Sequence, residues 1–233
     1  MAIITAEDAA TLRALFEDQL THDVTLVHYT QHESKLFVPG AVLCAACRDT
    51  KQLLEELVEL SDKLHLETHD FVADAAGAEA AGVDKIPATV VRGRDGGERA
   101  RFYGAPAGYE FTSLLEDVLD AGGDGPALPE PVAAALEQID QPVHLQVFVT
   151  ATCPYCPVSV RAAHALAMAS PQVTADMVIG PEFPHVAQRY QVMAVPKTVI
   201  NETHHFEGAL PVEDVARAVL LAIGKETEQL PAE

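Results

Sequence analysis

The sequence predicts an α/β protein made of two tandem units, each with a central mixed β-sheet flanked by helices. Three observations predict it. Apolar residues switch repeatedly between helical and strand spacing, a stretch rich in glycine and proline at residues 121–131 interrupts that pattern, and the same order of elements then begins again. We place the first unit at residues 1–121, a linker at 122–131 and the second unit at 132–233.

The elements follow from the spacing of apolar residues and from turn residues. In the first unit we expect helices at 6–20, 48–64 and 111–119, and strands at 24–29, 64–71, 86–91 and 99–103, with a turn at 93–97. In the second unit we expect strands at 143–149, 176–179, 195–200 and 205–208, and helices at 132–139, after the second cysteine pair, at 186–190 and at 212–223. Both units thus end in a hairpin followed by a helix.

The composition supports a folded chain and argues against several partners. Of the 233 residues, 48% are hydrophobic and 21% are charged, which is enough to bury a core. The formal net charge of -20 opposes binding to nucleic-acid phosphates and to anionic membranes. No apolar run reaches the ~20 residues that span a bilayer, and the acidic N-terminal segment does not resemble an export signal. We therefore expect a cytoplasmic protein.

An internal repeat relates the two units. Cys44 and Pro87 are 43 positions apart, and so are Cys153 and Pro196. Each proline stands in an apolar-Pro-x-Thr-Val sequence, and each expected hairpin ends in a Gly-Ala dipeptide. A repeat of about 110 residues indicates duplicated domains rather than a solenoid.

The four cysteines form two close pairs, Cys44-Ala-Ala-Cys47 and Cys153-Pro-Tyr-Cys156. In a reducing compartment such pairs are more often redox-active or metal-binding than structural. At a helix N-terminus, unpaired N–H groups and the helix dipole stabilise the thiolate of the first cysteine, and the second cysteine can resolve a mixed disulfide. We expect Cys153 to be the N-cap of its helix and Pro154 to be the first helical residue.

Nearby charges bear on the reactivity of both pairs. Arg48 follows the first pair and is itself followed by Asp49, whereas Arg161 follows the second pair with no acid in between. We interpret both surroundings as locally positive, with solvated helix residues as the alternative. The strand at 143–149 holds no carboxylate that could accept a proton. Glu182 could substitute, although a solvated acid is the more common case.

The two repeated prolines form the third component of the expected site. Pro87 and Pro196 each precede a strand, and a proline at such a position is suited to a cis turn packed beside a reactive sulfur. Such a turn leaves the backbone groups of the preceding residue, Ile86 or Val195, able to pair with an extended substrate segment. We expect these four residues to contribute to substrate binding.

With these features the chain resembles the protein disulfide oxidoreductases of archaea and thermophilic bacteria, which are related to glutaredoxin and contain two tandem thioredoxin folds. The resemblance covers nearly the whole chain, and its most specific segments are 56–64 (ELVELSDKL), 103–120 (YGAPAGYEFTSLLEDVLD), 147–164 (VFVTATCPYCPVSVRAAH) and 191–200 (QVMAVPKTVI). It implies dithiol–disulfide exchange on protein substrates, with Cys44 and Cys153 as attacking thiols and Cys47 and Cys156 as resolving thiols.

The resemblance also implies that other proteins supply and receive the electrons. A donor of the thioredoxin-reductase type, which is flavin-dependent, and an acceptor of the peroxiredoxin type are the partners it suggests. No Gly-rich dinucleotide motif follows a strand in this chain, so we expect no organic cofactor.

The first pair departs from the family pattern. The segment 31–43 looks inserted between the strand and Cys44, and the residues between Cys44 and Cys47 are both alanine. At the second pair, Pro154 restrains the backbone and Tyr155 offers a ring to the substrate. We therefore expect the C-terminal pair to carry most of the activity.

Two alternative functions remain open from the sequence. His28 and His32 precede Cys44 and Cys47 with the spacing of a reversed two-histidine, two-cysteine zinc site, although His28 falls within an expected strand. The other alternative is an electron relay or docking module of a peroxide-reducing system in which only one pair works.

Overall fold

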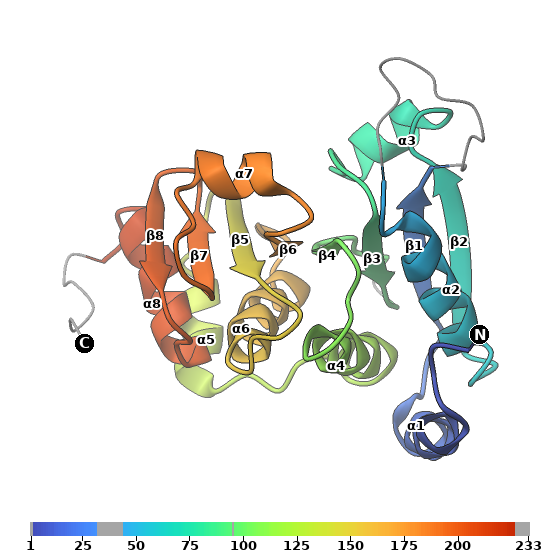
Figure 1. Ribbon diagram of the computed structural model, residues 1–233. Helices are drawn as coiled ribbons and strands as arrows, with labels where there is room; N and C mark the ends of the chain where they lie inside the picture. The colour runs from blue at the N-terminus through green and yellow to red at the C-terminus, as the bar shows by residue number, and fades with distance from the viewer. Residues whose placement is uncertain (1, 32–43, 95, 227–233) are drawn as a thin grey trace.

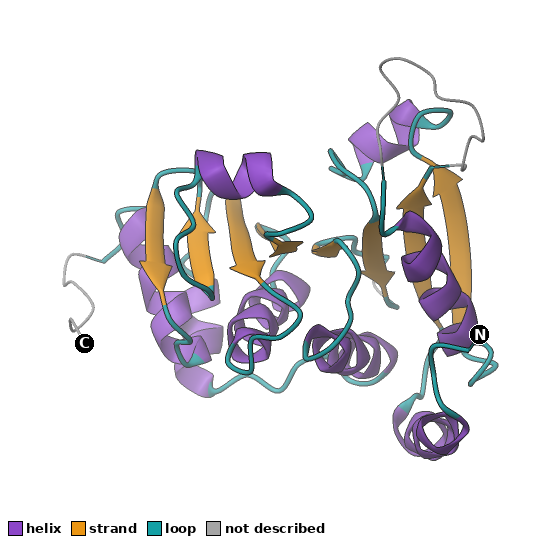
Figure 2. Ribbon diagram, in the orientation of Figure 1, coloured by secondary structure: helices purple, strands orange, loops and turns teal. Residues whose placement is uncertain are grey.

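The computed structural model describes residues 2–31, 44–94 and 96–226, and within them eight strands form one continuous sheet flanked by helices (Figures 1 and 2). The strands are β1 (Val24–Thr30), β2 (Leu64–Asp70), β3 (Ala88–Arg92), β4 (Ala100–Tyr103), β5 (Val143–Val149), β6 (Val173–Ile179), β7 (Lys197–Ile200) and β8 (His204–Glu207). The helices are α1 (Ala6–Gln19), α2 (Cys47–Val58), α3 (Ala75–Ala80), α4 (Glu110–Gly122), α5 (Glu130–Leu136), α6 (Cys156–Ala169), α7 (Pro184–Arg189) and α8 (Val212–Ala222).

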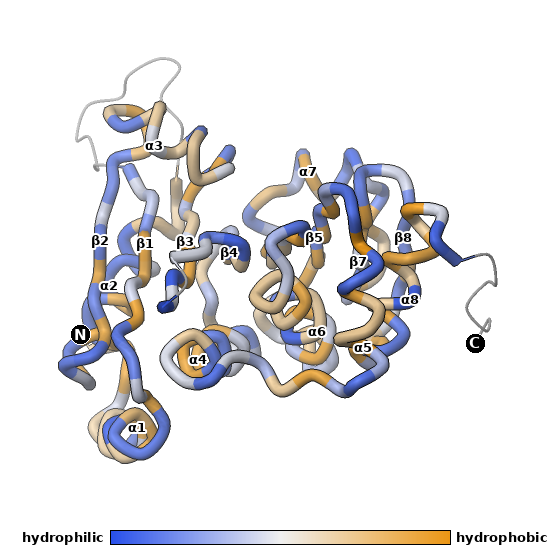
Figure 3. The backbone as a smooth tube through the Cα atoms, turned by 180° about the vertical axis from the view of Figure 1, so that it is seen from behind, coloured by the Kyte–Doolittle hydropathy of each residue, from blue (hydrophilic) through white to orange (hydrophobic). Residues whose placement is uncertain are grey.

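The sheet contains the same four-stranded pattern twice, in the order β2-β1-β3-β4-β6-β5-β7-β8. In each half the first two strands are parallel and the third and fourth form an antiparallel hairpin. The α/β class and the tandem arrangement are thus confirmed. Hydrophobic residues gather along the central strands β1 and β5 (Figure 3), because helices cover these strands and exclude water from them.

The two halves are joined edge to edge, because β4 pairs with β6 in parallel. Across this junction the Arg101 Nε donates a hydrogen bond to Asp176 over 2.6 Å, and both side chains are buried. A second nitrogen of Arg101 donates to the Gly82 carbonyl, and His144 Nε2 donates to the other oxygen of Asp176 over 2.7 Å. The two units therefore share a buried, charged hydrogen-bond network as well as a sheet.

The sheet is strongly twisted from one end to the other. The pairing makes β1 and β5 parallel, yet in Figure 1 their arrowheads point in nearly opposite directions. Each cysteine pair follows one of these two strands in the chain. The two pairs therefore follow strand ends that face different directions.

Helices α2 and α3 depart most from the elements that the sequence predicted. Helix α2 ends at Val58 rather than at residue 64, because Ser61 begins a tight turn in which its hydroxyl accepts a hydrogen bond from the Lys63 N–H. Helix α3 was not expected, since its alanine-rich sequence has no apolar periodicity. The Asp74 side chain caps it by accepting a hydrogen bond from the Gly77 N–H.

Two further expectations concern the segment 31–43 and the absence of a membrane span. Apart from Gln31, the segment 31–43 lies outside the described residues. In the described part of the chain, no helix has the length and apolar character that crossing a bilayer requires.

Candidate active site

Each cysteine pair forms a disulfide at the start of a helix. Cys44 and Cys47 are bonded with their Cα atoms 5.4 Å apart, and Cys153 and Cys156 with theirs 5.5 Å apart. The second cysteine of each pair is the first residue of its helix, α2 or α6, and is almost fully buried. The structure therefore places both pairs where a helix N-terminus can act on the sulfurs.

The expected N-cap at Cys153 is wrong, because α6 begins at Cys156 with Tyr155 as its cap. A helix that began at Pro154 would put Pro157 at the fourth position, the first at which the helix needs a backbone N–H. With the later start, Pro157 lies at one of the first two positions, where no donor is required. Cys153 consequently lies just outside the helix, at 8% exposure.

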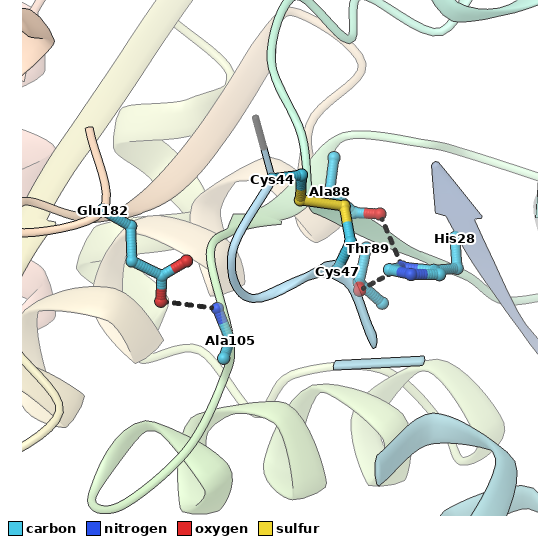
Figure 4. The surroundings of a disulfide bond; sticks show 7 residues. All are labelled: His28, Cys44, Cys47, Ala88, Thr89, Ala105 and Glu182. Carbon is cyan, nitrogen blue, oxygen red and sulfur yellow. Dashed lines mark hydrogen bonds between the residues drawn. A yellow bond between two sulfur atoms is a disulfide. The ribbon is translucent and has the colours of Figure 1, made fainter. Parts of the chain in front are cut away.

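Both repeated prolines follow cis peptide bonds, Ile86–Pro87 and Val195–Pro196, as we expected from their common offset. Each proline carbonyl accepts a hydrogen bond from the glycine that ends its hairpin, over 3.0 Å in the first unit and 2.9 Å in the second. Figure 4 shows Ala88, which follows Pro87, beside the Cys44–Cys47 disulfide. The first of the two proline turns thus lies against its cysteine pair.

Three large hydrophobic side chains are exposed close in sequence to the second pair or to its proline turn. They are Tyr155, Val158 and Met193, the last at 90% exposure. Exposed side chains of this kind can contact the apolar residues of a substrate.

The corresponding positions in the first unit are small or acidic. Shifted by the repeat of 109 residues, they are Ala46, Asp49 and Asp84, and both aspartates are exposed. The two sites therefore present different surfaces although their folds correspond.

A buried carboxylate, Glu110, lies at the start of α4 and was missed by the sequence analysis. Its side chain is fully buried, and Oε2 accepts a hydrogen bond from the Ser113 hydroxyl over 2.8 Å. Oε1 has no hydrogen-bond partner among the described residues. Burial raises the pKa of Glu110 to about 7, so this carboxyl group can both take up and release a proton near neutral pH.

Glu110 belongs to the first unit, but its helix begins beside the loop that leads to the second cysteine pair. The N–H of Tyr109 donates to the carbonyl of Ala151, two residues before Cys153, over 3.1 Å. Gly108 lies so close to that carbonyl that a Cβ atom there would be 2.2 Å from its oxygen. Helices α4 and α6 pack side by side and both follow parallel strands, so their N-termini lie at the same end (Figure 1).

A sequence signal for this carboxylate did exist. Helix α4 buries residues at i, i+3, i+4, i+7 and i+8, and three members of that buried face are polar, namely Glu110, Ser113 and Asp117. Polar residues on the apolar face of a helix require partners. The sequence analysis considered only the strand at 143–149 as the place of such an acid, whereas Glu110 belongs to the other unit.

The expectation of locally positive surroundings at the second pair is wrong. The Arg161 Nε donates to Glu116 over 2.7 Å, and its other nitrogens donate to Asp117 and Asp120 of α4. His164 Nδ1 lies 2.5 Å from the second oxygen of Asp117. Arg161 is thus neutralised by carboxylates more than 40 positions away in sequence, which the local sequence could not reveal.

Glu182, the acid considered as a substitute proton acceptor for the second pair, follows the end of β6. It accepts a hydrogen bond from the N–H of Ala105, over 3.0 Å, and partial burial raises the pKa of its carboxyl group. Figure 4 shows it in the surroundings of the first pair, on the side of Cys44.

The candidate zinc ligands are only partly described. His28 is fully buried in β1, and its Nδ1 lies 3.0 Å from the carbonyl oxygen of Ala88. Cys44 and Cys47 share a disulfide, so neither sulfur is a thiolate in this form. His32 lies outside the described residues, among which no group of three potential ligands occurs. The zinc hypothesis therefore stays a prediction.

The sequence matches one family model and several curated proteins. The family model of the thioredoxin domain matches residues 143–221. A component of the alkyl hydroperoxide reductase of Xanthomonas campestris pv. phaseoli is 30% identical over 185 residues, and NADH dehydrogenase of Bacillus subtilis is 26% identical over 168 residues. These alignments cover 73% and 72% of this chain but only 30% and 31% of the relatives, so the chain spans about a third of their length.

Solved structures resemble the whole fold. A protein disulfide oxidoreductase from Aeropyrum pernix has a TM-score of 0.85 at 25% identity, with 98% of this chain and 97% of that chain covered. The alkylhydroperoxide reductase component AhpF of Enterococcus faecalis has a TM-score of 0.81 at 25% identity, with 92% and 98% covered. These likenesses confirm the resemblance to protein disulfide oxidoreductases, and the chain is a thioredoxin-fold thiol–disulfide oxidoreductase with two Cys-x-x-Cys pairs.

Proposed function

We propose that the protein exchanges disulfides with protein substrates mainly through Cys153 and Cys156, with the first pair as a slower site or relay. The observation that carries this proposal is the buried carboxyl group of Glu110, whose helix packs beside α6 and whose pKa of about 7 suits proton transfer at neutral pH. The exposed apolar side chains of Tyr155, Val158 and Met193 support it.

In the proposed reaction the thiolate of Cys153 attacks a substrate disulfide. The substrate S–S bond breaks, a mixed disulfide forms, and one substrate sulfur leaves as a thiolate that takes up a proton. Glu110 then accepts the proton of the Cys156 thiol, and the resulting thiolate attacks the Cys153 sulfur. The second substrate sulfur leaves and takes up a proton, so the substrate gains two electrons and the enzyme pair is oxidised to its disulfide.

The proline turns would hold the substrate during this exchange. Val195 and Pro196 at the second site, and Ile86 and Pro87 at the first, precede strands that pair within the sheet. An extended substrate segment can add its backbone hydrogen bonds to the residue before such a proline. In this proposal Cys44 and Cys47 perform the corresponding attack and resolution at the first site.

The relatives suggest where the electrons come from and go. Two of the similar proteins are named as components of alkyl hydroperoxide reductases, which favours a relay between a reductase of the thioredoxin-reductase type and a peroxiredoxin-type acceptor. The net charge of -20 makes protein partners better candidates than nucleic acids, and redox-active cysteine pairs of this kind suit the cytoplasm.

The two single-cysteine variants test the proposal. Cys153→Ser is expected to remove most insulin-disulfide reductase activity, whereas Cys44→Ser is expected to keep a substantial fraction. Both substitutions change one sulfur to oxygen at a helix start, so each is the matched control of the other. The proposal is wrong if Cys44→Ser abolishes turnover and Cys153→Ser retains it.

The exposed apolar side chains give a second test. Met193→Asp puts at the second site the residue type that the first site has at Asp84, and we expect it to raise the KM for insulin about 10-fold through lost apolar contact. Reduction of a small aromatic disulfide should change less than twofold, because that substrate does not reach Met193. Asp84→Met serves as the control, and equal KM values for wild type and Met193→Asp would contradict the role of these side chains.

A further inference from the structure

A buried serine of α6 has a hydroxyl group without a hydrogen-bond partner. Ser159 is 2% exposed, and its Oγ atom is paired with no polar atom among the described residues. A serine within a helix can donate to a carbonyl of the preceding turn, but that bond is absent here. Leaving a buried hydroxyl unpaired costs free energy, so the group needs an explanation.

The internal repeat places a second hydroxyl at the same position of the first unit. Thr50 stands 109 positions before Ser159, and each of them follows the second cysteine of its pair by three residues. The Thr50 side chain is fully buried, and its Oγ1 also lacks a partner in the part of the chain that the structure describes. The same condition thus recurs at equivalent positions of both units while their disulfides are closed.

The spacing of three residues puts Ser159 on the same face of α6 as Cys156. Both belong to the buried residues of that helix. Residues three apart on a helix have Cβ atoms about 5–6 Å apart, and helical side chains lean toward the N-terminus. Ser159 therefore leans back over the turn that contains Cys156. Because Oγ and Sγ each lie one bond beyond Cβ, the two atoms can approach to hydrogen-bonding distance once the disulfide opens and the sulfur is free to turn.

The sulfur of Cys156 needs a hydrogen-bond donor when its disulfide opens. Cys156 is fully buried in a cluster of apolar residues, and a charged sulfur formed there has no contact with water. Pro157 has no backbone N–H, so it removes one of the donors that a helix N-terminus otherwise presents. A side-chain hydroxyl one turn further along the helix supplies a donor in its place.

We propose that the Ser159 hydroxyl donates a hydrogen bond to the Cys156 sulfur in the reduced protein and during resolution. The inference rests on the proposed role of Cys156 as the resolving thiol and adds the group that stabilises its charge. With a substrate sulfur bonded to Cys153, the Cys156 thiol loses its proton and Ser159 donates to the thiolate. This thiolate attacks the Cys153 sulfur, the Cys153–Cys156 bond forms, and the bond from Cys153 to the substrate breaks. The substrate sulfur leaves with the electron pair and takes up one proton, the number that Cys156 released, and the hydroxyl keeps its own.

This hydrogen bond favours the dithiol form of the second pair over its disulfide. The hydroxyl is unpaired in the disulfide, whereas reduction gives it a partner. Ser159→Ala removes the unpaired group from one form and the hydrogen bond from the other. The equilibrium of the second pair should therefore shift about 5-fold toward the disulfide. Resolution should slow about 10-fold, because a hydrogen bond to a charged sulfur is stronger than one to a neutral thiol.

The test uses the full chain with the first pair replaced, Cys44→Ser with Cys47→Ser, so that only the second pair reacts. The disulfide fraction in glutathione redox buffers at pH 7 gives the equilibrium. In the reaction of reduced protein with dithiobis(nitrobenzoate), the first nitrothiolate released reports attack by Cys153, and the second reports resolution by Cys156. We expect Ser159→Ala to shift the equilibrium and slow the second release, with the first release within about twofold of its parent. A role in packing alone would change the stability and neither of these quantities.

Three matched variants complete the test in the same protein. Ser159→Thr keeps a hydroxyl, with the residue type of the first unit, and should keep both quantities within about twofold. Thr50→Val removes the equivalent hydroxyl from the unit whose cysteines are replaced. Ser170→Ala removes a hydroxyl at the other end of α6. Neither of these two substitutions should alter the second pair.

The proposal is overturned if either the equilibrium or the second release is unchanged in Ser159→Ala. It is also overturned if Thr50→Val or Ser170→Ala has the same effects as Ser159→Ala. These results are separate from those that test the proposed function. Insulin reduction by Cys153→Ser and Cys44→Ser compares the two pairs without any change at Ser159, so an unchanged Ser159→Ala would leave that comparison intact.

Discussion

Glu110→Gln is expected to slow the reduction of insulin disulfides at pH 7 about 100-fold while it makes the folded protein more stable at pH 8. The glutamine has the same shape and can keep the hydrogen bond with Ser113, but it cannot take up the proton of Cys156. General acid–base catalysis contributes about 10²- to 10⁴-fold in enzymes, so a loss of this size is expected if proton transfer limits resolution.

The stability of this variant follows from the direction of the pKa shift. Burial raises the pKa of Glu110 from its ordinary 4.5 to about 7, so the unfolded chain loses this proton before the folded protein does. The wild type therefore loses stability as the pH rises from about 4.5 to 7, by at most about 3 kcal/mol, and the glutamine variant does not. Below pH 4 the two proteins should be equally stable.

Urea unfolding at pH 4 and pH 8, with insulin reduction over the same pH range, measures both effects. Glu137→Gln is the control, because Glu137 is exposed beyond the end of α5 and its replacement should change neither quantity. An unchanged pH–rate profile in Glu110→Gln would remove Glu110 from the reaction. A stabilised variant with an unchanged rate would show that the Glu110 carboxylate of the wild type only lowers the stability of the fold.

Asp176→Asn should destabilise the protein by about 3–5 kcal/mol, because it leaves the buried guanidinium of Arg101 without its countercharge. Although Asp176 is buried, the hydrogen bond from His144 and the charge of Arg101 hold the pKa of its carboxyl group below the usual value. The pair is therefore ionised at neutral pH, and the loss should appear throughout the range above pH 4.

A double-mutant cycle separates the pair from its surroundings. Arg101→Met and Asp176→Leu are made singly and together, and we expect the double variant, which has neither charge, to be more stable than either single variant. The free energy of unfolding is measured in urea at pH 7 for each variant. If Asp176→Asn unfolds at the same urea concentration as wild type, the junction between β4 and β6 does not depend on this ion pair.

The sequence predicted the features that repeat and missed those that depend on contacts between the units. The equal spacing of Cys44 to Pro87 and Cys153 to Pro196 was sufficient for the tandem fold and for two cis peptide bonds, since both are local consequences of each unit. Arg161 seemed an isolated charge until its partners on α4 were known.

The position of Glu110 shows the same limit more clearly. The segment that meets the start of its helix, at Ala151, lies about 40 residues further along the chain, and the two meet because β4 pairs with β6. The polar residues on the buried face of α4 signalled that a partner exists, but periodicity within one helix cannot say which distant segment supplies it. The start of α6 was misplaced for a local reason, the second proline at Pro157.

The junction of the two sheets also decides which backbone groups face solvent. In the described part of the chain the outermost strands are β2 and β8, and they carry histidines and carboxylates, among them His69, His205 and Glu207. Strands β4 and β6, which pair at the junction, are almost entirely buried. Cutting the chain between its halves would turn both of them into apolar edges with unpaired N–H and C=O groups, which attract other strands and promote aggregation. The paired junction leaves polar strands at the two margins, where charge and water oppose the addition of another chain.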